Sequence, residues 1–242
     1  MSITSAETTI ARPARPARPA RAATRGGGSA LAVVGGIALL AGPALFVAGL
    51  ASSPAETGDD KMSYLASLAR NPLQTQVSAV LLHYGNLLMG AGLLVLPWLV
   101  RGRRGARLTL IGALVAALLQ LNLSGALFTD WFHMELARQL PLDRAAAISD
   151  QALAYPLQQL CFGLSPLIAA GLIMAYVGLA RAGVVGWWSI PAIVAGYAGM
   201  LFLPYSIPIL PALGVLPLMA VLGVTGWRVL GRVRADRRPT AH

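Results

Sequence analysis

The chain has 242 residues, of which 56% are hydrophobic and only 12% are charged. A soluble domain carries about 25% charged residues, so this composition argues against a water-soluble globular protein and indicates a chain that lies mainly in lipid. The net charge of +10 does not indicate nucleic-acid binding, because the basic residues lie in tails and short loops rather than clustered with aromatic side chains. We therefore expect no nucleic-acid partner.

Long stretches without a charged residue predict the membrane spans. Only helices and closed barrels satisfy their backbone hydrogen bonds in lipid, and these uncharged runs are too long and continuous for barrel strands. A span needs about 20 residues, and the longest run, 182–227, has room for two, divided at Pro204 and Pro208. The expected fold is all-α, a polytopic bundle of six spans at residues 30–51, 76–99, 108–129, 156–180, 184–203 and 209–230.

The positions of the basic residues predict the orientation of these spans. Lys and Arg accumulate in cytoplasmic loops, and most of the 19 basic residues fall in segments 1–29, 100–107, 181–183 and 231–242 or at the edge of the last span. We therefore expect both termini in the cytoplasm (N-in/C-in) and a multi-pass protein of a bacterial cytoplasmic membrane. The expected parts are a disordered Arg/Pro-rich tail over 1–29, a transmembrane domain over 30–230 and a short basic tail over 231–242.

Two further expectations concern the surfaces of the bilayer. The basic N-terminal tail should be attracted to anionic lipid heads at the cytoplasmic face. On the outer side, Met62, Leu65 and Ala69 follow helical spacing, and Asp143 is placed to cap a helical turn that begins at Arg144. Short interfacial helices are therefore expected in both outer loops, with plain connecting loop as the alternative.

Polar side chains inside the expected spans form a layer in the outer half of the bilayer. No Asp, Glu, Lys or Arg lies in the apolar core of a span, which argues against charge-driven transport. At a rise of 1.5 Å per residue, His83 lies about 10 Å and Gln120 about 13 Å below the outer surface. Such groups should face one another, either as a binding pocket or only as hydrogen bonds that hold the bundle together. The candidate binding residues of this polar layer are His83, Asn86, Gln120, Asn122, Gln158 and Ser165.

Motifs for catalysis or cofactor binding are weak. His83, Asp130 and His133 are the best candidates for a metal site, because imidazole and carboxylate groups suit Zn²⁺ and similar ions. The sequence has no phosphate-binding loop and no Gly-x-Ser-x-Gly elbow. The single cysteine, Cys161, is expected to be a packing residue rather than a nucleophile. We expect no cofactor.

The Arg/Pro-rich tail, the six spans, the acidic outer loops and the stretch His83–Leu88 are similar to multi-pass membrane proteins of GC-rich bacteria that have no assigned activity. This resemblance implies no functional residue. We expect a non-enzymatic integral membrane protein with a polar pocket in the outer half of the bilayer. The alternatives are a permease or transporter subunit for a small solute, and a membrane-embedded enzyme that uses His83 and Asp130. Assembly with a second copy or with another membrane protein is left open.

Overall fold

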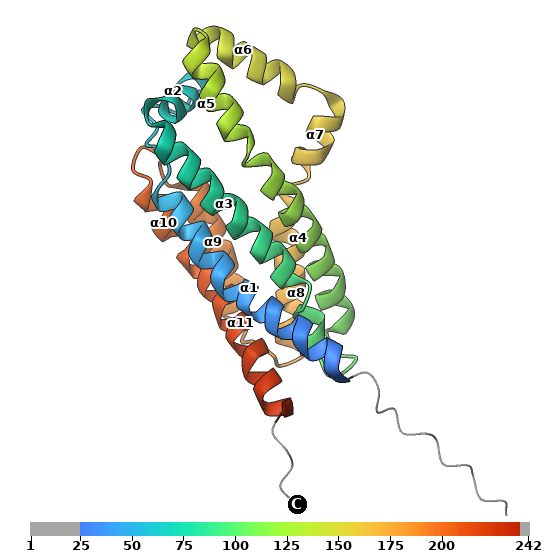
Figure 1. Ribbon diagram of the computed structural model, residues 1–242. Coiled ribbons are helices and arrows are strands. Elements are labelled where there is room, and N and C mark those ends of the chain that lie inside the picture. Colours follow the sequence, from blue (N-terminus) through green and yellow to red (C-terminus); the bar gives the residue numbers. More distant parts are fainter. Residues whose placement is uncertain (1–24, 238–242) are drawn as a thin grey trace, which may run out of the picture.

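Long, roughly parallel helices form a bundle that shorter helices cover at one end (Figure 1). The computed structural model describes residues 25–237, and within this range every regular element is a helix. The expected all-α class is therefore confirmed. The elements are α1 (Arg25–Ala51), α2 (Lys61–Arg70), α3 (Pro72–Leu93), the 3₁₀ helix η1 (Leu96–Leu99), α4 (Ala106–Ala126), α5 (Thr129–Gln139), α6 (Leu142–Leu153), α7 (Pro156–Gly163), α8 (Leu167–Arg181), α9 (Ser189–Phe202), α10 (Ile209–Gly214) and α11 (Leu216–Arg237).

Four of the described helical segments are long and apolar enough to cross a membrane. They match the first, third, fourth and sixth expected spans, and they are Ser29–Ala51, Ala106–Gln139, Pro156–Arg181 and Leu216–Arg237. The second and fifth expected spans correspond to α3 and α9, which do not meet the same criteria. Polar residues such as Gln74 and Gln76 dilute the apolar character of α3, and α9 has only 14 residues.

Some helix boundaries agree with the expected ones and others differ. The expected break near Pro204 and Pro208 is present, because α9 ends at Phe202 and α10 begins at Ile209. The expected second span continues only as far as Leu93 as α helix, and the fourth is interrupted between Gly163 and Leu167. The last helix extends to Arg237, so much of the expected basic C-terminal tail is helical. Residues 1–24, which hold most of the expected N-terminal tail, and residues 238–242 lie outside the described range.

The two loops that were expected on the outer side both contain short helices, as predicted. Asp60 caps α2, where its carboxylate accepts a hydrogen bond from the backbone N–H of Ser63 at 2.8 Å. The expected cap at Asp143 is wrong: α6 begins at Leu142, two residues before the expected start at Arg144, and its N-cap is Pro141. Asp143 instead lies in the first turn of α6, where its negative charge interacts favourably with the positive end of the helix dipole.

Glycines allow the long helices to approach closely. A Cβ atom at Gly85 on α3 would lie 2.7 Å from the backbone nitrogen of Phe46 on α1. A Cβ atom at Gly112 on α4 would lie 2.4 Å from the backbone nitrogen of Ala175 on α8. Small residues at such crossings let backbones approach in lipid, where helix association depends on van der Waals packing.

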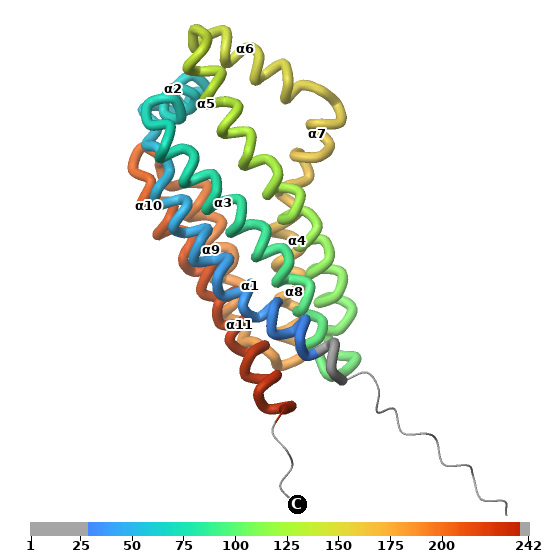
Figure 2. Tube along the Cα trace, in the orientation of Figure 1, coloured from blue at the N-terminus to red at the C-terminus, as the bar shows by residue number. Residues whose placement is uncertain are grey.

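The two ends of the bundle differ in chemistry. At one end, which we call the basic end, Arg101 pairs with Asp236 at 3.1 Å and Arg237 donates to Ser29 at 3.2 Å. Arg228 also reaches a backbone carbonyl there. The opposite end is covered by α2, α5 and α6, which together we call the cap (Figure 1). The described ends of the chain both lie at the basic end (Figure 2).

Candidate functional site

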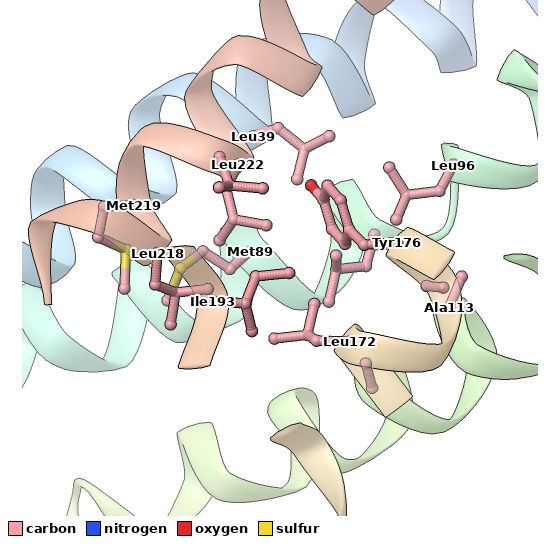
Figure 3. Close-up of a cluster of buried hydrophobic side chains, with 14 of the residues drawn as sticks. Leu39, Met89, Leu96, Ala113, Leu172, Tyr176, Ile193, Leu218, Met219 and Leu222 are labelled. Carbon is pink, nitrogen blue, oxygen red and sulfur yellow. The ribbon is translucent and has the colours of Figure 1, made fainter. Parts of the chain in front are cut away.

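A cavity of about 390 Å³ lies inside the bundle. Its walls come from α1, α3, α4, α8, α9 and α11, together with the link between α7 and α8. Figure 3 shows part of this region, where Met89, Leu172, Ile193 and Leu218 meet from four different helices. Most lining side chains are apolar, and none is charged. The lining residues are Phe46, Asn86, Met89, Leu93, Gln120, Leu123, Ser165, Pro166, Ile168, Ala169, Leu172, Tyr197, Met200, Leu201, Leu218, Met219 and Leu222.

Two carboxamides supply a polar edge to this apolar cavity. Asn86 is 1% exposed and its Nδ2 donates to the carbonyl of Leu82 one turn earlier in α3, at 2.9 Å. Gln120 on α4 is 8% exposed and donates from Nε2 to Oδ1 of Asn86. Buried polar groups are costly unless they are hydrogen-bonded. The interhelical amide pair therefore holds α3 against α4 and fixes both side chains beside the cavity.

Three residues that line the cavity carry an oxygen atom with no side-chain hydrogen bond. Among the described residues, Oε1 of Gln120 and the hydroxyl groups of Ser165 and Tyr197 have no side-chain hydrogen bond. Ligand sites in proteins are commonly apolar cavities of about 300–1,000 Å³ with a few polar groups that orient the ligand. The arrangement can therefore hold a neutral molecule and accept or donate a small number of hydrogen bonds.

The structure divides the predicted polar layer into separate groups. Asn86, Gln120 and Ser165 all line the cavity. Asn122 instead faces α7 and donates to the carbonyl of Cys161 at 2.7 Å. Gln158 lies on α7 and does not line the cavity.

His83 also lies apart from the cavity. Its Nδ1 is 2.9 Å from the backbone carbonyl oxygen of Ser124 and 2.9 Å from the Ser124 hydroxyl oxygen. Its ring packs against Phe128, with 4.0 Å between the ring centroids. His83 thus joins α3 to the end of α4, while the amide pair provides the polar edge of the cavity.

The three predicted metal ligands have other partners. His83 contacts Ser124, Asp130 accepts a hydrogen bond from Tyr64, and Nε2 of His133 lies 2.9 Å from the Ser149 hydroxyl. Within residues 25–237, no group of three or more His, Cys, Asp or Glu side chains is placed to hold a metal ion. The geometry therefore gives the predicted metal site no support.

The cap contains a network of polar side chains. Lys61 lies 4.0 Å from the Asp150 carboxylate and 5.8 Å from the centre of the Tyr64 ring. Burial, and then the negative charge of Asp130, raise the pKa of Tyr64 well above its ordinary value. Tyr64 therefore remains a hydrogen-bond donor throughout the physiological pH range. This network ties α2, α5 and α6 together.

A second carboxyl group beside the cap is also perturbed. Burial, and then repulsion from Asp59 and Asp130, raise the pKa of Glu56 above its ordinary value. The backbone N–H of Glu56 donates to the carbonyl of Tyr205 at 3.3 Å, which joins the loop after α1 to the loop after α9. Glu56 is thus a titratable group at a junction between loops.

Sequence reasoning missed Tyr197 and the methionines of the cavity. Tyr197, Met89 and Met200 all lie within apolar helices, where nothing in their spacing distinguishes a cavity wall from a packed interface. The only usable signal was the pair of carboxamides at Asn86 and Gln120. The contact between these two side chains could be inferred from their similar depth in the bilayer. The cavity beside them could not be inferred from the sequence.

The fold and the site define an all-helical protein with at least four segments suited to crossing a membrane and an uncharged internal cavity, which indicates a membrane protein. Comparison with family models, with curated proteins and with solved structures finds no match.

Proposed function

We propose that this is a non-enzymatic integral membrane protein that binds a small neutral molecule in the cavity beside Asn86 and Gln120. The observation that carries the proposal is a cavity of about 390 Å³ with an amide pair at its edge, inside an otherwise apolar bundle. The pair also serves to pack the bundle. Binding is favoured as an additional role because Oε1 of Gln120 and two hydroxyl groups are left available at the same cavity.

The proposal includes six spans with both termini in the cytoplasm of a bacterial cell. Three observations support this topology. First, α3 has 22 residues, about 33 Å of helix at 1.5 Å per residue, and it packs along α1. Second, the described chain ends lie at the same end of the bundle, as an even number of crossings requires (Figure 2). Third, arginines gather at that end, and this is the pattern of a cytoplasmic face. The cavity then lies in the outer half of the bilayer.

Thermal unfolding in detergent micelles tests ligand binding. A ligand that binds only the folded state stabilises it by about 2.7 kcal/mol at 100 times its Kd. We choose 1-naphthol as the probe, because it is neutral and apolar and carries one hydroxyl group. It should raise the Tm in a saturable manner, whereas naphthalene-1-sulfonate, which is charged, should not.

Two alanines provide matched variants for this experiment. Ala169 lines the cavity, while its neighbour Ala170 is exposed on the outside of α8. Ala169→Phe should fill the cavity and abolish the shift caused by 1-naphthol, and Ala170→Phe should leave it intact. No shift in the wild type, or the same shift in both variants, would contradict the proposal.

A permease is the second candidate, and interrupted helices favour it. Helical structure is interrupted between α7 and α8 and between α9 and α10. The lining residues Ser165 and Leu201 lie next to these interruptions. Transporter sites are often built where helices are discontinuous. Efflux of 1-naphthol from proteoliposomes, faster than from empty liposomes and slowed by Ala169→Phe, would support transport. Binding without accelerated efflux would exclude transport of this probe.

A further inference from the structure

We infer that the ligand of the cavity is a neutral lipid with a hydroxyl or carbonyl head group, and that it enters sideways from the bilayer between α8 and α9. This inference rests on the proposed binding function and adds the ligand class and the route of entry.

The walls formed by α1, α3 and α11 are closed. Met89 and Leu93 on α3 are 3% and 1% exposed, and Leu222 on α11 is 2% exposed. None of the lining residues comes from α2, α5 or α6. The cavity therefore does not continue into the polar cap, and a solute from the water has no lined path into it from that end.

The opposite wall reaches the surface of the bundle. Leu201 on α9 lines the cavity and is 69% exposed, and Pro166 at the start of α8 is also exposed. The surface around this mouth is apolar, since Phe202 and Leu167 are 83% and 47% exposed. Such a surface is expected to face lipid acyl chains. A molecule that reaches the mouth therefore comes from the membrane.

The chemistry of the lining selects among membrane molecules. No lining residue is charged, and an unpaired charge is very costly to place in an apolar cavity. Anionic phospholipid heads, free ions and zwitterionic solutes are therefore disfavoured. A hydroxyl group can donate to Oε1 of Gln120, and a carbonyl can accept from the hydroxyl groups of Ser165 or Tyr197. An uncharged head group fits the groups that remain unpaired.

Photolabelling in phosphatidylcholine vesicles tests the inference with the full chain. The vesicles contain a trace of either a diacylglycerol or a phosphatidic acid that carries the same diazirine-bearing acyl chain. After irradiation, mass spectrometry of peptides locates the labelled residues. The diacylglycerol should label cavity residues such as Ala169 and Met200 several-fold more than the phosphatidic acid does. Both lipids should label Leu118, which is 62% exposed on α4, to the same extent.

Variants at the mouth separate entry from binding. Leu201→Trp should narrow the mouth and reduce cavity labelling several-fold, whereas Val194→Trp, at an exposed position of α9 that does not line the cavity, should not. Any of three outcomes would overturn the inference. The two lipids could label the cavity equally, the label could be confined to the lipid-facing surface of the bundle, or Leu201→Trp could leave cavity labelling unchanged. If 1-naphthol still stabilises the protein in micelles, binding stands and only the lipid and its route are wrong. If it does not, the proposed function itself has failed.

Discussion

The phenolic hydroxyl of Tyr64 donates a hydrogen bond to Oδ1 of Asp130, which lies 66 residues further along the chain. This contact joins α2 to the start of α5. The α4–α5 segment Ala106–Gln139 has 34 residues, about 51 Å at 1.5 Å per residue, whereas the apolar core of a bilayer is about 30 Å thick. The segment is therefore longer than the apolar core of a bilayer is thick, and the contact between Tyr64 and Asp130 holds the start of α5 against α2.

Tyr64→Phe should destabilise the cap while keeping the ring in place. A hydrogen bond to a charged group contributes about 1.5–3 kcal/mol. Among the described residues, the Asp130 carboxylate accepts a side-chain hydrogen bond from Tyr64 and from no other residue, so the variant leaves it without a side-chain donor. We expect a loss of about 2 kcal/mol, measured as a lower Tm in micelles. The matched control is Tyr155→Phe, because Tyr155 is 62% exposed. Equal Tm values for the two variants would show that the hydrogen bond adds no stability.

Glu56 should make stability depend on pH in the acidic range. Because folding raises the pKa of this carboxyl, the folded state holds the proton more tightly than the unfolded state. Stability contributed by the protonated form is therefore lost as the pH rises from about the ordinary value of 4.5 through the folded pKa. Glu56→Gln should flatten this part of the profile. The measurement is the Tm of the wild type and of the Glu56→Gln variant across pH 4–7. The difference between the two Tm values should become smaller as the pH falls.

A double-mutant cycle should detect coupling between Asn86 and Gln120. Gln120→Leu leaves Oδ1 of Asn86 without its partner, and a buried unpaired group costs about 1–3 kcal/mol. Asn86→Leu similarly removes the acceptor of Gln120. The double variant should therefore be less destabilised than the sum of the single ones, by about 1 kcal/mol, as is usual for interhelical hydrogen bonds in lipid. Strict additivity of the three changes in unfolding free energy would mean that the two amides act independently.

Much of the helical layout could be predicted from the absence of charge. The uncharged runs locate α1, α4, α8 and α11, because a long apolar segment has only the helix available in lipid. The break between α9 and α10 was predictable from Pro204 and Pro208. Hydropathy alone could not determine where α3 stops, since η1 follows it within the same apolar run. That boundary coincides with Pro97, whose ring would clash with the carbonyl of Leu93, four residues earlier, if the α helix continued.

The candidate site was predicted only in part. Depth along the helices grouped six residues, of which Asn86, Gln120 and Ser165 line the cavity, whereas His83, Asn122 and Gln158 do not. Equal depth brings residues to the same level, whereas the rotation of each helix decides which of them meet. Rotation here follows from close crossings at glycine. Nothing in the local sequence specifies which glycine faces which helix.

Gly112 and Gly125 lie on the same helix and should respond oppositely to alanine. A Cβ atom at Gly112 would lie 2.4 Å from the backbone nitrogen of Ala175, whereas a Cβ atom at Gly125 would have no neighbour within 4 Å. Gly112→Ala must push α4 away from α8, and overpacking of this kind typically costs about 1–3 kcal/mol. Gly125→Ala should instead stabilise α4 by up to about 1 kcal/mol, because alanine favours the helix. The Tm of the two variants in micelles should therefore shift in opposite directions. A lower Tm for both would indicate that alanine is not tolerated in α4 for a reason other than the contact with α8.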